Sequence, residues 1–261
     1  MANLIRGAKC GNEWSPNDLD AYSIRVKYVD EEEFFGKKVD DTSTNINKNF
    51  LEYDFSSGKE LPPDSEELLA YLDMASSGLE CKVDEYAKEL LKSMEYRKEG
   101  RIISIRHILK FFTCGTFSTA QTDVCIFRTS TGLLLLLQED KRLISTKDPE
   151  AQVIAEAIAA FQENNKIRIA NYKEQLDKML IPCITMVGTF PRFYLVPITK
   201  ELNRNIMHGT FPENETIVLC HIPRVPRRVS DGMKPIENRK KILQCFEVFK
   251  KFVDELEREL L

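Results

Sequence analysis

The sequence has little histidine and no long apolar run. Its three histidines are scattered at positions 107, 208 and 221, which argues against a histidine-rich metal site and against a Ser/His/Asp triad. The longest uninterrupted aliphatic run is Leu133–Leu137, far short of the roughly 20 residues that a membrane helix needs. We therefore expect no membrane span, and we expect any chemistry to come from carboxylates and lysine.

Cysteines are present but show no pairing pattern. The seven residues are odd in number and lie far apart in the sequence, which argues against a disulfide framework and against a zinc knuckle. The N-terminal stretch MANLIRGAKCGNEW becomes polar and charged too early for a secretory signal. We expect reduced thiols in an intracellular protein, either cytoplasmic or nuclear.

The balance of charge excludes a general polyanion binder. The 37 basic and 41 acidic residues give a formal net charge of −4, so any site for nucleic acid must be local. One basic cluster lies late in the chain and comprises Arg224, Arg227, Arg228, Lys234, Arg239, Lys240 and Lys241. Its arginines at 224, 227 and 228 could neutralise phosphates without reading bases. The alternative, a solvated loop and helix end, is equally compatible with the sequence.

Hydrophobic periodicity predicts two regions. Residues 1–80 are polar and rich in turn signals, which predicts an N-terminal accessory region packed on a core of residues 81–261. In the core the patterns predict helices over 83–96, 152–170 and 238–261, and strands within 103–115, 122–132, 133–142, 184–199 and 215–223. This element order predicts an α/β fold, a three-layer sandwich around a mixed central sheet.

The informative constellation lies in the second and third strands. Side chains alternate across a strand, so Glu139 and Lys141 share one face at the end of the leucine run. If the two strands pair in antiparallel fashion, Asp123, near the start of one, lies beside these two residues at the end of the other. Two close carboxylates repel unless a cation bridges them, and Mg²⁺ takes oxygen ligands of this kind. Together with a lysine for an attacking water, they indicate phosphodiester hydrolysis.

These residues resemble a known signature. Asp123, fifteen intervening residues and then Glu139-Asp140-Lys141 is similar to the D…(D/E)-x-K pattern of the PD-(D/E)XK nuclease superfamily. The predicted order over 83–184 also resembles its restriction-endonuclease-like core of helix, three-stranded meander, helix and strand. The strings AQTDVCIF, LLLLLQEDK, DPEAQVIAEAIAAFQ and ITMVGT further resemble a group of basidiomycete fungal proteins with this core.

The resemblance implies a role for each matching residue. Asp123 and Glu139 would ligate Mg²⁺ or Mn²⁺, and the backbone carbonyl of Asp140 would complete the metal shell. Lys141 would serve the attacking water, and Gln152, on the following helix, would position the site or the nucleic acid.

Two departures from the pattern matter. Members of the superfamily often have a proline before the first acid, where this chain has Thr122. A further acid often comes from the first helix, and the sequence does not decide between Asp84, Glu85 and Glu89.

The sequence thus predicts a metal-dependent nuclease acting on DNA or RNA. The alternative from another class is a nuclease-fold protein that no longer cleaves and serves interaction or regulation. A third reading, hydrolysis of a non-nucleic phosphate ester, predicts a small closed pocket. The motif itself has a plain alternative too, with Asp123 as a turn residue and 139–142 as a solvated loop. Whether the chain forms a homodimer is left open.

Overall fold

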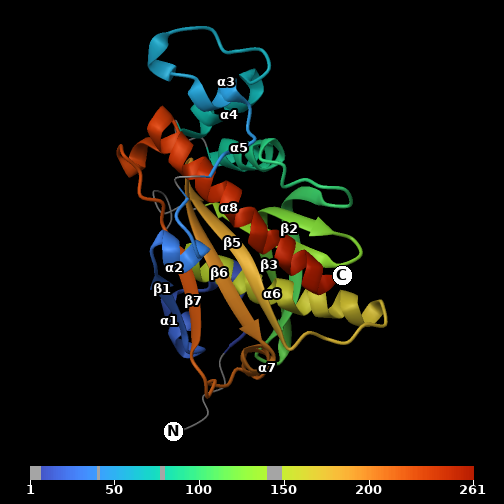
Figure 1. The fold of residues 1–261 in the computed structure, drawn as a ribbon. Helices are drawn as coiled ribbons and strands as arrows, with labels where there is room; N and C mark the ends of the chain where they lie inside the picture. Colours follow the sequence, from blue (N-terminus) through green and yellow to red (C-terminus); the bar gives the residue numbers. More distant parts are fainter. Residues whose placement is uncertain (1–6, 40–41, 77–79, 140–148) are drawn as a thin grey trace.

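The computed structural model describes residues 7–39, 42–76, 80–139 and 149–261, with the backbone alone at 80, 81 and 139. A seven-stranded mixed sheet crosses the molecule, and helices cover both of its faces (Figure 1). The long C-terminal helix α8 (Ile236–Leu260) crosses one face, and helix α6 (Pro149–Ala170) lies on the other. The predicted α/β class with a mixed central sheet between helices is confirmed.

The sheet combines parallel and antiparallel pairs. Its strands are β1 (Ile24–Tyr28), β2 (Ile102–Thr113), β3 (Thr116–Arg128), β4 (Gly132–Glu139), β5 (Lys178–Val187), β6 (Phe190–Thr199) and β7 (Thr216–His221). Their spatial order is β1-β7-β6-β5-β4-β3-β2. Strand β1 runs parallel to β7 and β4 parallel to β5, whereas the remaining neighbours are antiparallel.

Shorter helices surround this sheet. They are α1 (Pro16–Ala21), α2 (Glu31–Phe35), α3 (Lys48–Glu52), α4 (Glu66–Ser76), α5 (Glu80–Ser93) and α7 (Lys200–His208), with 3₁₀ turns at Gly11–Glu13, Phe55–Ser57 and Val229–Asp231. Among the described residues, no helix combines the length and the apolar composition that a bilayer crossing requires.

Each helix and strand predicted within residues 81–261 has a counterpart in the structure, although 140–142 of the predicted strand 133–142 lie outside the described residues. The structure changes three details. Strand β3 begins at Thr116, because 116–121 pair with β2, so Asp123 lies within the strand; its predicted place at the strand start is wrong. Helix α7 follows β6 directly, where the sequence analysis expected no element. Strand β1 comes from the N-terminal region and extends the central sheet beside β7. The division at residue 80 stays a prediction.

Strand β4 and helix α6 form the centre of the molecule. All five leucines of 133–137 are buried, and the alanine-rich face of α6 packs closely against them. Asn164 of α6 clamps the start of β4, since its Oδ1 accepts from the Leu133 N–H at 2.7 Å and its Nδ2 donates to the Leu133 carbonyl at 2.9 Å. Gly132 is required there, because a Cβ at its φ of +110° would lie 2.1 Å from Asn164 Oδ1. These two hydrogen bonds hold α6 against β4, and so they help to position the N-terminal half of α6 over the sheet.

Candidate functional site

Asp123 lies next to the last described pair of strands β3 and β4. Strand β3 pairs with β2 on both sides of this residue, but its described pairing with β4 begins only at Val124, opposite Leu137. Gln138, the next residue of β4, donates from Nε2 to Asp123 Oδ2 at 2.5 Å. The cross-strand neighbour of the half-buried Asp123 is therefore Gln138, one residue before the end of β4.

Helix α6 adds a second carboxyl group over the same point. The Glu156 side chain is 0% exposed, and its Oε1 accepts from Gln152 Nε2 at 3.1 Å. Its Oε2 has no hydrogen-bond partner among the described residues. Burial raises the pKa of Glu156 well above its usual range, and the neighbouring Asp123 carboxylate raises it further.

Two buried thiols lie near Glu156 on the side of the sheet. Burial raises the pKa of Cys125 on β3 to about 12, and the nearby Glu156 adds to the shift. The Cys183 thiol on β5 has a raised pKa for the same two reasons. Both thiols are fully buried, so they are inert. They show that Glu156 lies between α6 and the sheet, close to strands β3 and β5.

The sequence analysis included Gln152 and missed Glu156. A glutamate in an alanine-rich helix is usually a solvated residue, and periodicity does not separate it from the other polar positions of 149–170. The available signal was its spacing, four residues after Gln152 and so on the same helix face. Glu156 accepts a hydrogen bond from Gln152 and lies close enough to Asp123 for that carboxylate to raise its pKa; the predicted roles of Asp123 and Gln152 stay predictions.

The remaining residues of the predicted motif lie at the limit of the described chain. Glu139 is the last residue of β4, and its backbone pairs with Met186 of β5. The Glu139 side chain and the whole of Asp140 and Lys141 lie outside the described residues. The expected convergence of Glu139 and Lys141 on Asp123 stays a prediction.

The candidate acids of the first helix, α5, differ in their surroundings. Glu85 pairs with Lys82 at 2.7 Å and Glu89 with Lys92 at 2.6 Å, both one turn apart on the helix surface. Asp84 is the buried member, at 7% exposure. Of these three acids, Asp84 alone is withdrawn from solvent.

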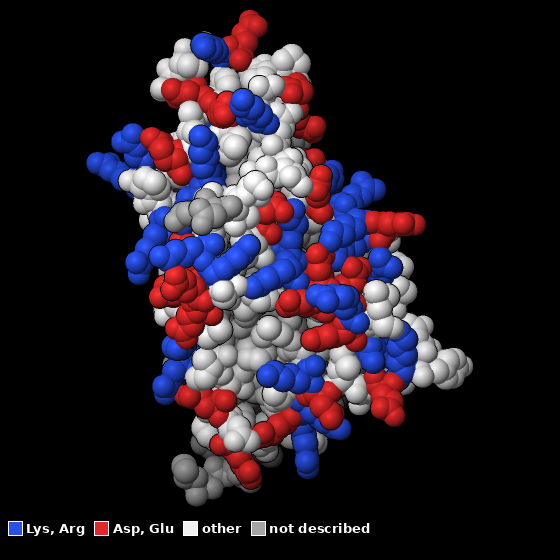
Figure 2. All heavy atoms as spheres, in the orientation of Figure 1, with Lys and Arg blue, Asp and Glu red and all other residues white. Residues whose placement is uncertain are grey.

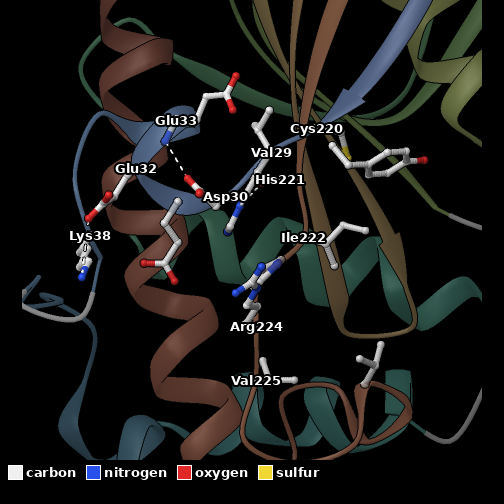
Figure 3. A pocket seen from close by; sticks show the side chains of 14 residues that line it. Val29, Asp30, Glu32, Glu33, Lys38, Cys220, His221, Ile222, Arg224 and Val225 are labelled. Carbon is white, nitrogen blue, oxygen red and sulfur yellow. Dashed lines mark hydrogen bonds and ion pairs between the residues drawn. The ribbon is translucent and has the colours of Figure 1, made fainter.

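The three candidate phosphate-binding arginines lie after β7, and all three are exposed. Arg227 is partly engaged, since its Nη2 lies 3.3 Å from Glu237 Oε1. Arg224 lines a cavity of about 960 Å³ beyond the ends of β1 and β7, together with Asp30 and His221 (Figure 3). Strands β6, β5 and β4 separate this cavity from Asp123 in the sheet.

Three other members of the basic cluster are buried or paired in the structure. The inclusion of Arg239 was wrong, because its side chain is 0% exposed and is bound to backbone carbonyls. Lys234 pairs with Asp73 at 2.7 Å, and Lys241 pairs with Glu31 at 2.5 Å. On the face that carries α8, cationic and anionic side chains are interspersed (Figure 2).

The donor atoms of the Asp123 site suit a hard cation. Among the described residues there is no group of three or more His, Cys, Asp or Glu side chains that could hold a metal ion. Asp123 and Glu156 nevertheless supply two neighbouring carboxyl groups, and the unpartnered Glu156 Oε2 is an oxygen ligand of the kind that Mg²⁺ and Mn²⁺ take. Mg²⁺ usually keeps several waters and needs only one or two carboxylates from the protein.

Comparison with known proteins adds no family. No family model matches the chain, and no curated protein is similar to it at a significant level. The geometry around Asp123 is therefore the basis for a functional hypothesis.

Proposed function

We propose that this protein is a divalent-metal-dependent nuclease with a PD-(D/E)XK, restriction-endonuclease-like core. One observation carries the proposal: Asp123 lies just beyond the last described pair of β3 and β4, and α6 brings the buried Glu156, bound by Gln152, close to it. The succession α5, β2, β3, β4, α6, β5, with β4 parallel to β5, supports it. In open α/β sheets, ligands bind beyond the carboxyl ends of parallel strands. The carboxyl end of β4 is Glu139, one residue after Gln138, which binds Asp123.

Each residue then has a defined task. Asp123 and Glu139 hold Mg²⁺ or Mn²⁺, with the backbone carbonyl of Asp140 as a further oxygen ligand. The bound cation supplies positive charge against the developing negative charge on the phosphate oxygens. Lys141 holds and orients the attacking water.

Two glutamines support these groups from either side. Gln138 fixes the Asp123 carboxylate through its 2.5 Å hydrogen bond, and Gln152 fixes Glu156 from the helix. Neither glutamine side chain titrates, so any pH dependence of these two hydrogen bonds comes from the carboxyl groups. The exposed Arg224, Arg227 and Arg228 hold phosphates of the nucleic acid away from the cleavage point.

A cleavage assay tests this proposal. Supercoiled plasmid, linear duplex, single-stranded DNA and structured RNA are incubated with Mg²⁺, Mn²⁺ or EDTA. The wild type is expected to cut at least one substrate only with metal, and Asp123→Ala and Lys141→Ala are each expected to reduce the rate about 100-fold or more. Matched controls are Asp177→Ala and Lys166→Ala, which remove surface residues with exposed side chains and are expected to cut normally.

The same assay separates the rival function. If purified, folded wild type is inert on every substrate with either metal, the nuclease proposal fails, and the nuclease-fold interaction module takes its place. Cutting that survives both substitutions would instead show that the activity lies elsewhere or in a contaminant.

A further inference from the structure

We propose that Glu156 is a direct ligand of the cation, and so the acid that completes the site in place of Asp84, Glu85 or Glu89. The inference rests on the proposed function for the nature of the cation. The observation behind this inference is that two carboxyl groups, one from β3 and one from α6, lie close together, and each accepts a hydrogen bond from a glutamine amide.

The described residues compensate the burial of Glu156 only in part. Its side chain is 0% exposed, and Oε2 receives no hydrogen bond from them. Removing an ionised carboxylate from water without a compensating partner costs several kcal/mol. A carboxyl group in this position is therefore either protonated or bound to a cation.

The contacts of Glu156 favour a cation over a proton. Gln152 donates an N–H to Oε1, and such a bond stabilises the ionised form of a carboxyl group. The hydroxyl of Thr122 lies 3.0 and 3.2 Å from the carbonyls of Val124 and Leu137. Thr122 is also a hydrogen-bonding neighbour of Glu156 and, like Gln152, lowers the pKa of that carboxyl group, which favours its ionised form. On the sheet side, Asp123 likewise accepts an amide N–H, from Gln138. Two carboxyl groups that both accept amide donors form an oxygen-rich pair suited to a divalent cation.

The competing explanation is a structural carboxylic acid. A protonated Glu156 would pack as a neutral group under α6 and bind no metal. The substitution Glu156→Gln separates the two cases, because the amide keeps the volume and neutrality of the acid but is a poor ligand for Mg²⁺ or Mn²⁺. Glu163→Gln on the same helix is the matched control, since Glu163 pairs with Lys166 at the surface.

The test is isothermal titration of the full chain with Mn²⁺ and with Mg²⁺ at pH 7.5. Wild type and Glu163→Gln are expected to bind with equal affinity, and Glu156→Gln more than about tenfold more weakly. Circular dichroism and the melting temperature of the metal-free proteins establish that all three are folded. Equal affinity of wild type and Glu156→Gln, or no binding by the wild type, would overturn the inference.

Cleavage measured on the same samples keeps the two proposals apart. If the wild type binds Mn²⁺ through Glu156 but cuts no substrate, the inference stands and the nuclease proposal fails. If wild type and Glu156→Gln cut equally well, the nuclease proposal stands and the inference fails.

Discussion

Two fully buried polar side chains, Arg239 of α8 and Glu156 of α6, belong to helices that cover opposite faces of the sheet. Their surroundings differ in kind. All three nitrogen atoms of the Arg239 guanidinium donate hydrogen bonds to backbone carbonyls. By contrast, one carboxylate oxygen of Glu156 receives no hydrogen bond from the described residues. Saturated polar groups in a core hold the fold together, and an unsatisfied one needs an explanation. Under the proposed function, we expect a structural role for Arg239 on the α8 side and a functional role for Glu156 on the α6 side.

The contacts of Arg239 show how a buried charged side chain stabilises the fold. Its guanidinium donates to the carbonyls of Phe50, Tyr53, Met233 and Lys234 at 2.6–2.9 Å. The rings of Phe50 and Phe55 lie 5.4 and 5.5 Å from its Cζ. Burial lowers the pKa of Arg239, yet an arginine stays charged at any ordinary pH. One side chain thereby ties the segment of α3 and the 3₁₀ turn that follows it to the start of α8.

The largest effect is expected from Arg239→Met, which keeps the bulk and removes the donors. It leaves several buried carbonyls unpaired, so we expect the free energy of unfolding to fall by about 3–5 kcal/mol. Urea denaturation measures the change, with the exposed Arg258→Met on the same helix as a control. A loss of less than about 1 kcal/mol in the free energy of unfolding would contradict the structural role of Arg239.

The next effect concerns Arg101, whose buried guanidinium pairs with Asp254 at 2.6 Å and with Glu257 at 2.5 Å. Burial alone would raise the pKa of both acids, but their hydrogen bonds and the nearby cations outweigh it and hold both pKa values below the usual range. The stabilisation is then complete above the unfolded-state pKa values of about 3.9 and 4.3. It is lost as the pH falls through the lower pKa values of the folded state.

Arg101→Met tests this pH dependence. At pH 7 we expect a loss of about 1–3 kcal/mol, and between pH 5 and pH 2 the stability of the variant is expected to fall less steeply than that of the wild type. Denaturation across this range measures both. Parallel pH profiles would show that the ion pairs contribute nothing to the acid sensitivity.

The smallest effect is expected from joint replacement of Arg224, Arg227 and Arg228 by alanine. Each lost phosphate contact lowers the slope of log affinity against log salt by about 0.9 on duplex DNA, so the slope is expected to fall by up to about 3. Arg227 contributes least, since Glu237 already pairs with it. Fluorescence anisotropy with a labelled duplex in EDTA measures the slope, and an unchanged slope would exclude these arginines from the binding surface.

The sequence predicted those helices and strands in which apolar residues recur at a regular spacing or form a continuous run. The leucine run of β4, the alanine-rich α6 and the amphipathic α8 were all found from their patterns. Strand β1 was missed because its five residues form a strand only through pairing with β7, nearly 200 residues later in the chain. The residues of a short segment do not reveal which distant strand it pairs with.

The site was predictable in part for the same reason. The motif predicts roles for Asp123 and Gln152, which stay predictions. It does not predict the burial of Glu156, which depends on the packing of α6 over β4, where Asn164 binds the start of the strand. Arg239 resembled its exposed basic neighbours in sequence, and its burial depends on carbonyls supplied by 50–53. In both cases a distant segment decides what a charged residue does.

The most direct test measures stability and metal-dependent cleavage on the same preparations of Asp123→Asn and Arg239→Met. We expect Asp123→Asn to lose cleavage about 100-fold or more while unfolding near the wild-type urea midpoint. Arg239→Met is expected to lose stability while its folded fraction cuts at the wild-type rate. If instead Asp123→Asn cuts normally, or Arg239→Met loses cleavage without losing stability, the assignment of function to the α6 side and of structure to the α8 side is contradicted.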